Sequence, residues 1–124
     1  CYNASPDSMR AAVNAFSAMG CRGRRILVLA DMLELGETAK ELHQEIGVLV
    51  AQNPIHILAC VGELGKNYAE GALSAGLQEA FHFEDKEELF QFLKGNVQED
   101  DILWFKGSRG MKLEEVISRL YEEC

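Results

Sequence analysis

Two cations and a hydroxyl stand close together near the end of the chain, in the segment Lys106-Gly107-Ser108-Arg109-Gly110-Met111. An apolar run at residues 102–105 precedes this segment, and an amphipathic stretch at 113–121 follows it. The order predicts a buried strand, a tight glycine turn and the beginning of a helix. Unpaired amides and the dipole of a helix N-terminus attract anions, so the turn is a candidate anion site. A solvated turn whose glycines serve only geometry is the alternative interpretation.

The composition is that of a small, acidic globular protein. The length of 124 residues fits one typical domain, so we expect residues 1–124 to form a single domain. The net charge of −8 argues against nucleic acid and against anionic membranes as partners, because both attract basic surfaces. No apolar run approaches the roughly 18 residues that a membrane-spanning helix requires.

The cysteines indicate neither a disulfide framework nor a metal site. Cys1, Cys21, Cys60 and Cys124 form no CxxC pair and no zinc-finger spacing, so we predict no bound metal in this domain. Scattered thiols in an acidic domain favour a reducing compartment, and we therefore expect a cytoplasmic protein.

Apolar runs and amphipathic stretches alternate along the chain. Three of the four apolar runs are nearly continuous, which is typical of parallel strands covered on both faces. Strict alternation of helix and strand predicts an α/β fold with a mainly parallel, Rossmann-like sheet and right-handed crossovers. The expected strands are 26–30, 55–61, 80–83 and 102–105, and the expected helices are 6–19, 38–51, 65–75, 86–93 and 113–121.

Two helix starts carry capping signals. Ser5 is a candidate N-cap before Pro6, a residue favoured at the first helical position. Thr38 is a candidate N-cap with Glu41 three residues later, which is the pattern of a capping box.

The carboxyl ends of the strands define where a ligand would bind. The loops expected at that edge contain Asp31, the turn at 62–65, the pair Glu84-Asp85 and the basic segment at 106–110. Because a helix rather than a strand opens the chain, we expect one or more N-terminal strands to be missing and the chain to be the tail of a longer protein. Residues 2–5 would then share the same edge.

Two features of these loops and one helical residue could take part in chemistry. Gly62-Glu63-Leu64-Gly65-Lys66-Asn67 is not a P-loop, since two residues rather than four precede Gly-Lys and no Ser or Thr follows, so we predict a turn and a helix start. Asp31 follows a strand and could hold an amine, a proton or a metal, or serve only the turn. His43 lies inside a helix with no visible partner and is expected to be structural.

Taken together, three segments resemble the C-terminal domain of the Mur ligases. They are Tyr2-Asn3-Ala4-Ser5-Pro6-Asp7-Ser8-Met9, then Ala30-Asp31-Met32-Leu33-Glu34-Leu35-Gly36 with His43 and Gly47, and Lys106 to Met111. Ala30 stands where the family usually has Gly, and Ser5 where its first motif commonly has Asn. Within the family the motifs are most similar to members that join D-alanyl-D-alanine to UDP-N-acetylmuramoyl-tripeptide.

The resemblance implies a three-layer α/β/α sandwich around a six-stranded mixed sheet. Its first two strands would lie upstream, which leaves four strands here with the last beside the first. An exposed sheet edge would result, and this fragment could dimerise through it.

The resemblance also implies an enzyme of peptidoglycan synthesis. ATP and Mg²⁺ would activate the tripeptide carboxylate as an acyl phosphate, which the amine of D-alanyl-D-alanine attacks. The P-loop and metal ligands belong to the family's central domain. The domain seen here would therefore bind neither ATP nor Mg²⁺ by itself, and it would be inactive without its N-terminal and central neighbours.

Site residues follow from the same resemblance. The basic turn would face the amino substrate, with Lys106, Ser108 and Arg109 around its carboxylate and with Asp31 and Met32 nearby. Asp31 would orient the substrate ammonium. Tyr2, Asn3 and Ser5 would lie on the nucleotide-facing edge.

Two other functions fit parts of the pattern. A receiver-like signalling domain would use Asp31 as its phosphoacceptor and Lys106 as its partner, although proline usually follows that lysine and Gly107 stands here. A non-catalytic α/β binding module is the second alternative.

Overall fold

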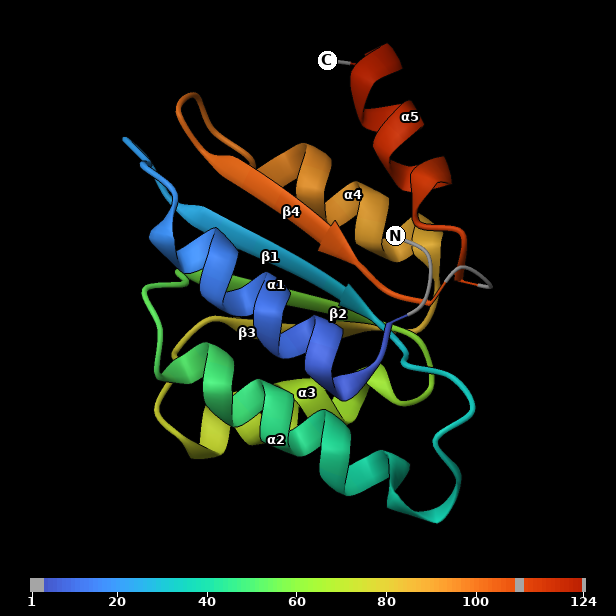
Figure 1. The fold of residues 1–124 in the computed structure, drawn as a ribbon. Helices are drawn as coiled ribbons and strands as arrows, with labels where there is room; N and C mark the ends of the chain where they lie inside the picture. The colour runs from blue at the N-terminus through green and yellow to red at the C-terminus, as the bar shows by residue number, and fades with distance from the viewer. Residues whose placement is uncertain (1–3, 109–110, 124) are drawn as a thin grey trace.

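The computed structural model describes residues 4–108 and 111–123, in which helices and strands alternate as the sequence predicts (Figure 1). A short 3₁₀ turn, η1, precedes the second helix and was not predicted from the sequence. The elements are α1 (Pro6–Ala18), β1 (Arg25–Ala30), η1 (Gly36–Thr38), α2 (Ala39–Ala51), β2 (Ile57–Val61), α3 (Gly65–Ser74), β3 (Ala80–Phe83), α4 (Lys86–Asn96), β4 (Ile102–Lys106) and α5 (Glu114–Glu123).

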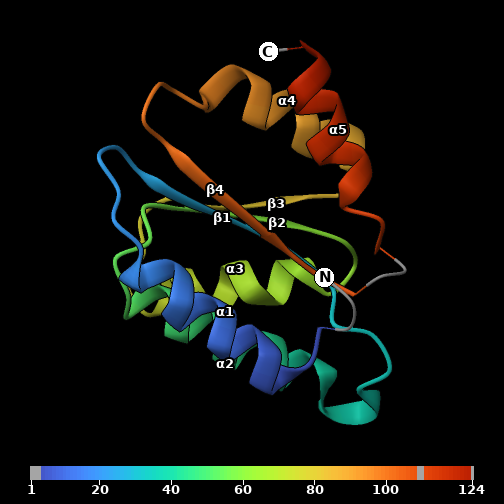
Figure 2. The same ribbon diagram turned by 45° about the horizontal axis from the view of Figure 1, so that its top comes forward.

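The four strands form one parallel sheet between two helix layers. Their order is β3-β2-β1-β4, so the last strand lies beside the first as expected. Figure 2 shows the sheet nearly edge-on, with α1, α2 and α3 on one face and α4 and α5 on the other. The predicted three-layer α/β/α sandwich is thus confirmed. Within the described residues β4 pairs only with β1 and forms one edge of the sheet.

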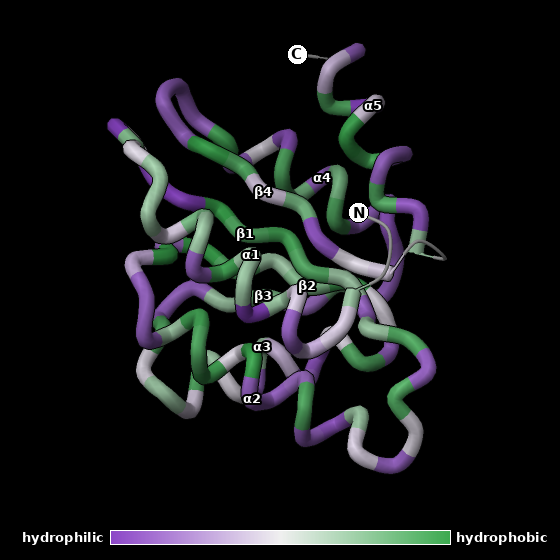
Figure 3. Tube along the Cα trace, viewed as in Figure 1, coloured by the Kyte–Doolittle hydropathy of each residue, from purple (hydrophilic) through white to green (hydrophobic). Residues whose placement is uncertain are grey.

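The two faces of the sheet bury alternate residues of the same strands. In β1, Leu27 and Leu29 point into the core under α1, α2 and α3, while Ile26 and Val28 point toward α4 and α5. Figure 3 shows β1 as a nearly unbroken hydrophobic segment through the middle of the molecule. Burial on both faces explains why this strand reads as a continuous apolar run.

Of the two predicted caps, one is confirmed and one is wrong. The Ser5 hydroxyl accepts a hydrogen bond from the Ser8 amide, and the Ser8 hydroxyl accepts one from the Ser5 amide, which closes a capping box before Pro6. Thr38 precedes α2 but makes no side-chain cap. Thr38 is the last residue of η1, and its hydroxyl donates back to the Leu35 carbonyl oxygen rather than capping α2.

Two glycines let α2 and α3 approach until their backbones touch. A Cβ on Gly47 would lie 2.0 Å from the Tyr68 carbonyl oxygen, and one on Gly71 would lie 2.2 Å from that of Gln44. No larger residue fits at either position without separating the helices. This contact fixes α2 against α3.

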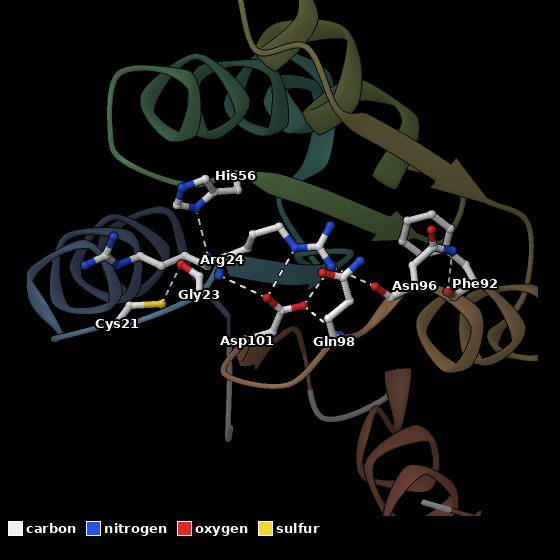
Figure 4. Close-up of polar contacts among 9 residues, drawn as sticks. Cys21, Gly23, Arg24, His56, Phe92, Asn96, Gln98 and Asp101 are labelled. Atoms are coloured by element: carbon white, nitrogen blue, oxygen red, sulfur yellow. Dashed lines mark hydrogen bonds and ion pairs between the residues drawn. The ribbon is translucent and has the colours of Figure 1, made fainter.

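A partly buried ion pair joins the amino ends of β1 and β4. The Arg24 guanidinium donates to both carboxylate oxygens of Asp101, and the Arg24 amide donates to the same carboxylate at 2.9 Å (Figure 4). The amide of Gln98 adds a further bond at 2.8 Å. The Arg24 hydrogen bonds outweigh burial and lower the pKa of Asp101 to about 2. The carboxylate thus ties the turn before β4 to the start of β1.

Among the residues described, no helix has both the length and the apolar character needed to cross a bilayer.

Acid should weaken this ion pair in a defined pH window. The folded-state pKa of Asp101 lies below its ordinary value of 3.8, so its contribution is complete above about pH 4 and is lost as the pH falls toward about 2. We expect Asp101→Asn to lower the free energy of unfolding by about 2 kcal/mol at neutral pH and to flatten the acid limb of the stability curve.

Urea unfolding from pH 7 to pH 2 measures both effects. Asp100→Asn is the matched control, because the neighbouring side chain is exposed, and it should change stability by less than about 0.5 kcal/mol. Equal losses in the two variants would contradict the assignment.

Candidate functional site

The loop after β1 carries Asp31, whose carboxylate is held by the turn after β2. Its Oδ1 accepts a hydrogen bond from the Leu64 amide at 3.0 Å, and only 6% of the residue is exposed. Burial raises the pKa of the Asp31 carboxyl, while the amides of Leu64 and Gly65 and the nearby His43 offset part of this effect. The N-terminus of α3 thus receives a carboxylate from another strand.

Ser108 fastens the same loop to the turn after β4. Its amide donates to the Asp31 carbonyl oxygen at 3.2 Å, and its hydroxyl oxygen accepts from the Leu33 amide at 3.0 Å. Sequence reasoning predicted a Ser108 that contributes its hydroxyl and backbone amide to a ligand. The amide is instead used inside the fold, and the hydroxyl retains only its proton for donation.

His43 reaches the loop from α2. Its Nε2 accepts a hydrogen bond from the Met32 amide at 3.0 Å, and its Nδ1 lies 2.6 Å from the Ala39 carbonyl oxygen. The ring is fully buried, and burial lowers the pKa of His43, an effect that Ala39 and Asp31 partly oppose. The expected structural histidine therefore makes a specific contact beside Asp31.

Met32 needs a correction. Its side chain is fully buried in the core beneath α1, α2 and α3 and has no exposed surface to offer a substrate. We therefore remove Met32 from the proposed substrate contacts. The exposed apolar side chain of this loop is Leu33, 41% of which is accessible.

The remaining predicted residues are only partly placed. Lys106 ends β4 opposite Leu29 of β1 and is half-buried at the same edge of the sheet. Ser5 lies before α1 and uses its hydroxyl to cap that helix. Arg109, Tyr2 and Asn3 lie outside the described residues.

These contacts define the carboxyl-edge site as the loop 31–33, the turn 62–65 and residues 106–108. The turn at 62–65 is confirmed as a turn and helix start. Its helix N-terminus holds the Asp31 carboxylate, which occupies the place a phosphate would take. Within residues 4–108 and 111–123, no group of three or more His, Cys, Asp or Glu side chains is arranged to hold a metal ion.

The sequence did not predict that these polar groups form hydrogen bonds with one another. The spacing of His43 and Gly47 places both on one face of α2, which was the available signal for a buried histidine. Nothing in the sequence pairs His43 with Met32, or Ser108 with Leu33, because these contacts span 11 and 75 residues.

Comparison with known proteins assigns the family. The family model described as "Mur ligase, glutamate ligase domain" matches residues 1–109, and the chain belongs to this family. Membership argues against a receiver-like signalling domain, because the matched stretch includes Asp31 and Lys106 in their Mur-ligase context. The sequence resemblance is thereby confirmed.

Similar proteins are consistently ligases of one kind. The UDP-N-acetylmuramoyl-tripeptide–D-alanyl-D-alanine ligase of Bacillus subtilis is 41% identical over 122 residues, which cover 98% of this chain and 27% of that protein. The crystal structure of MurF from Acinetobacter baumannii shares 31% identity with a TM-score of 0.84, covering 98% of this chain and 27% of that one. MurF from Thermotoga maritima, solved in complex with ADP, is 24% identical with a TM-score of 0.78 over 98% and 27% of the two chains, and shows the shared fold. The chain thus spans about a quarter of the length of the relatives that it matches.

Gly62 is expected to be irreplaceable beside Asp31. Its φ is +110°, and a Cβ there would lie 2.5 Å from Asp31 Oδ1. Gly62→Ala should therefore lower the free energy of unfolding by more than about 2 kcal/mol, because backbone strain and collision with the carboxylate add.

Gly76→Ala isolates the strain term and is measured alongside. Gly76 has a φ of +105° with no atom within 4 Å of its added Cβ. Gly76→Ala should therefore lower the free energy of unfolding by at least about 1 kcal/mol less than Gly62→Ala does. Equal losses in thermal or urea unfolding would show that the Asp31 contact does not constrain this turn.

Proposed function

We propose that this chain is the C-terminal, amino-substrate-binding domain of an ATP-dependent ligase of peptidoglycan synthesis. The ligase joins D-alanyl-D-alanine to UDP-N-acetylmuramoyl-tripeptide through an acyl phosphate. The chain supplies the site for the incoming dipeptide, and N-terminal and central domains of the same protein supply the rest. The protein works in the cytoplasm, and the isolated domain is inactive.

The observation that carries this proposal is the convergence of the family's motifs on one edge of the sheet. The Asp31 loop and Ser108 are bonded directly, and Lys106 lies at the end of the adjacent strand. The 41% identity to the Bacillus subtilis ligase extends over nearly the whole chain, so it includes these segments. The site therefore lies where ligands of open α/β sheets bind.

The charges at this edge suit a zwitterionic dipeptide. Lys106 is a cation at this edge that can receive a carboxylate. Arg109 follows it in the sequence, and an Arg guanidinium can bind a carboxylate with two parallel bonds. The Asp31 carboxylate, held by the Leu64 amide, supplies a negative charge that attracts the substrate ammonium. The Ser108 oxygen accepts from the Leu33 amide, and among the described residues its hydroxyl proton has no acceptor, so it can be donated to a ligand.

The N-terminus of α3 does not fit the phosphates of a nucleoside triphosphate. The Asp31 carboxylate already occupies the N-terminus of α3, and like charges would repel a phosphate there. ATP and Mg²⁺ would then be held by the other domains, with Tyr2, Asn3 and Ser5 at the edge that faces the nucleotide. What this chain contributes is orientation of the amine and exclusion of water from the activated carboxyl group.

A domain chimera tests the proposal. This chain replaces the matching quarter of the Bacillus subtilis ligase, and phosphate release is measured with UDP-N-acetylmuramoyl-tripeptide, ATP and D-alanyl-D-alanine. We expect activity that depends on the D,D-dipeptide and not on L-alanyl-L-alanine. A folded chimera without turnover would favour a non-catalytic binding module, and turnover with a different amine would correct the substrate.

Asp31→Asn in the chimera tests the negative charge at the site. The Asn oxygen can still accept from Leu64, so the fold is retained while the negative charge is lost. We expect the KM for D-alanyl-D-alanine to rise about tenfold or more. Asp7→Asn, at a side chain 98% exposed on α1, is the matched control and should leave KM unchanged. Unchanged KM and kcat in Asp31→Asn would rule out this role.

A further inference from the structure

His43 belongs to a sequence motif that the proposed chemistry does not use. It stands one helical turn before Gly47 on α2, and its ring is fully buried. A buried imidazole must satisfy its two nitrogens inside the protein, because an unpaired polar group there is costly. Its two hydrogen-bond partners lie on α2 and in the loop 31–33.

The two hydrogen bonds of His43 define its tautomer. The Met32 amide is a donor, so Nε2 must be the unprotonated acceptor at 3.0 Å. Nδ1 therefore carries the proton and donates to the Ala39 carbonyl oxygen at 2.6 Å. Ala39 is the first residue of α2, so this bond holds the ring against its own helix and directs Nε2 at the loop.

The position of the ring is set by packing as well. The Tyr68 ring of α3 lies with its centroid 4.7 Å from that of His43, and the Tyr68 hydroxyl donates to the Ala30 carbonyl oxygen at 3.0 Å. Gly47 lets the backbones of α2 and α3 come into contact at Tyr68. Tyr68 and His43 thus hold Ala30 and Met32, the two residues that flank Asp31.

We propose that His43 is the positioning residue of the carboxyl-edge site, and that its neutral imidazole fixes the Met32 amide and thereby the geometry of Asp31 and Leu33. The inference rests on the proposed function only for what the site binds. Ser108 holds the loop through the Asp31 carbonyl oxygen and the Leu33 amide, and His43 holds it through the Met32 amide. Without the bond between His43 and the Met32 amide, the Asp31 carboxylate would still accept from the Leu64 amide, but its orientation toward a ligand would no longer be fixed.

Protonation of His43 would break this arrangement. Imidazolium has no acceptor, so Nε2–H would face the Met32 N–H, donor against donor. The titratable groups that face the ring are Asp31 from the loop and Tyr68 from α3, with Cys60 of β2 behind Tyr68. Burial raises the pKa of both Tyr68 and Cys60, so they stay neutral. The Ala39 carbonyl and the Asp31 carboxylate favour the imidazolium. Because burial dominates and lowers the pKa of His43, the loop should stay fastened at neutral pH and loosen as the pH falls below about 6.5.

Amide hydrogen exchange on the isotope-labelled chain, without ligand, tests the inference. Protection factors of Met32 and Leu33 are compared with those of core amides in β2 between pH 8 and pH 5. In the wild type we expect Met32 protection to fall about tenfold relative to the core as the pH is lowered. His43→Gln retains an acceptor that does not titrate, so its Met32 protection should be high and independent of pH.

Two variants separate positioning from general stability. His43→Phe fills the space without an acceptor and should lower Met32 protection at least about tenfold relative to β2 at pH 7.5. Ile46→Val, in the same core one turn along α2, should weaken all amides together. If His43→Phe fails to fold, the pH series on the wild type and His43→Gln decides the question alone.

Kinetics in the chimera link positioning to the site. We expect His43→Phe to raise the KM for D-alanyl-D-alanine several-fold more than Ile46→Val, with His43→Gln close to the wild type. Equal relative protection in all variants, or a wild-type Met32 amide whose relative protection ignores pH, would overturn the inference. Failure of the proposed function looks different: the wild-type chimera has no activity, while the exchange results still decide whether His43 positions the loop.

Discussion

The structure depends on how one short loop satisfies its polar groups. Beyond β1 the chain turns away from the sheet, and residues 31–33 have no ladder partners of their own. The Asp31 carboxylate goes to the turn after β2, its carbonyl goes to the turn after β4, and the Met32 amide goes to α2. Buried polar groups left unpaired would each cost about 1–3 kcal/mol, so these bonds constrain four segments together.

The sheet order makes this arrangement possible. Because β1 lies between β2 and β4, the loops that follow those two strands flank its carboxyl end. Gly47 and Gly71 bring α2 and α3 into backbone contact, which places His43 within reach of the loop. A different strand order or a wider helix spacing would leave Asp31 without Leu64 and Met32 without His43. The site is therefore a property of the whole topology rather than of any one motif.

The same constraint explains why this edge suits a polar ligand in an otherwise acidic domain. The carboxylate of Asp31 is fixed by the protein, while Lys106 lies at the end of the adjacent strand. A negative and a positive group thus stand at one edge of the sheet, which supports the proposed zwitterionic ligand. At the opposite end of the sheet, Arg24 and Asp101 pair with each other and connect the start of β1 to the start of β4.

Much of the fold could be predicted because its signals are local. Continuous apolar strands, amphipathic helices and the Ser5 cap are each encoded within a few residues. The position of β4 beside β1 came from the family resemblance, since periodicity alone does not order strands. The Thr38 prediction was wrong because Thr38 lies in the 3₁₀ turn η1, where its hydroxyl bonds to the Leu35 carbonyl oxygen and not to an amide of α2. Met32 misled because a motif residue next to Asp31 was taken for a surface residue, whereas the loop turns its side chain into the core.

The central claim is that the dipeptide binds at the carboxyl edge around Asp31, and an NMR titration of the labelled chain tests it most directly. D-alanyl-D-alanine is added to millimolar concentration, with L-alanyl-L-alanine as the stereochemical control, and backbone amide shifts are followed. The account predicts stereoselective shifts confined to residues 31–33, 62–65 and 106–111. A well-dispersed spectrum whose shifts are absent there, equal for both dipeptides, or centred on α4 and α5 would contradict it.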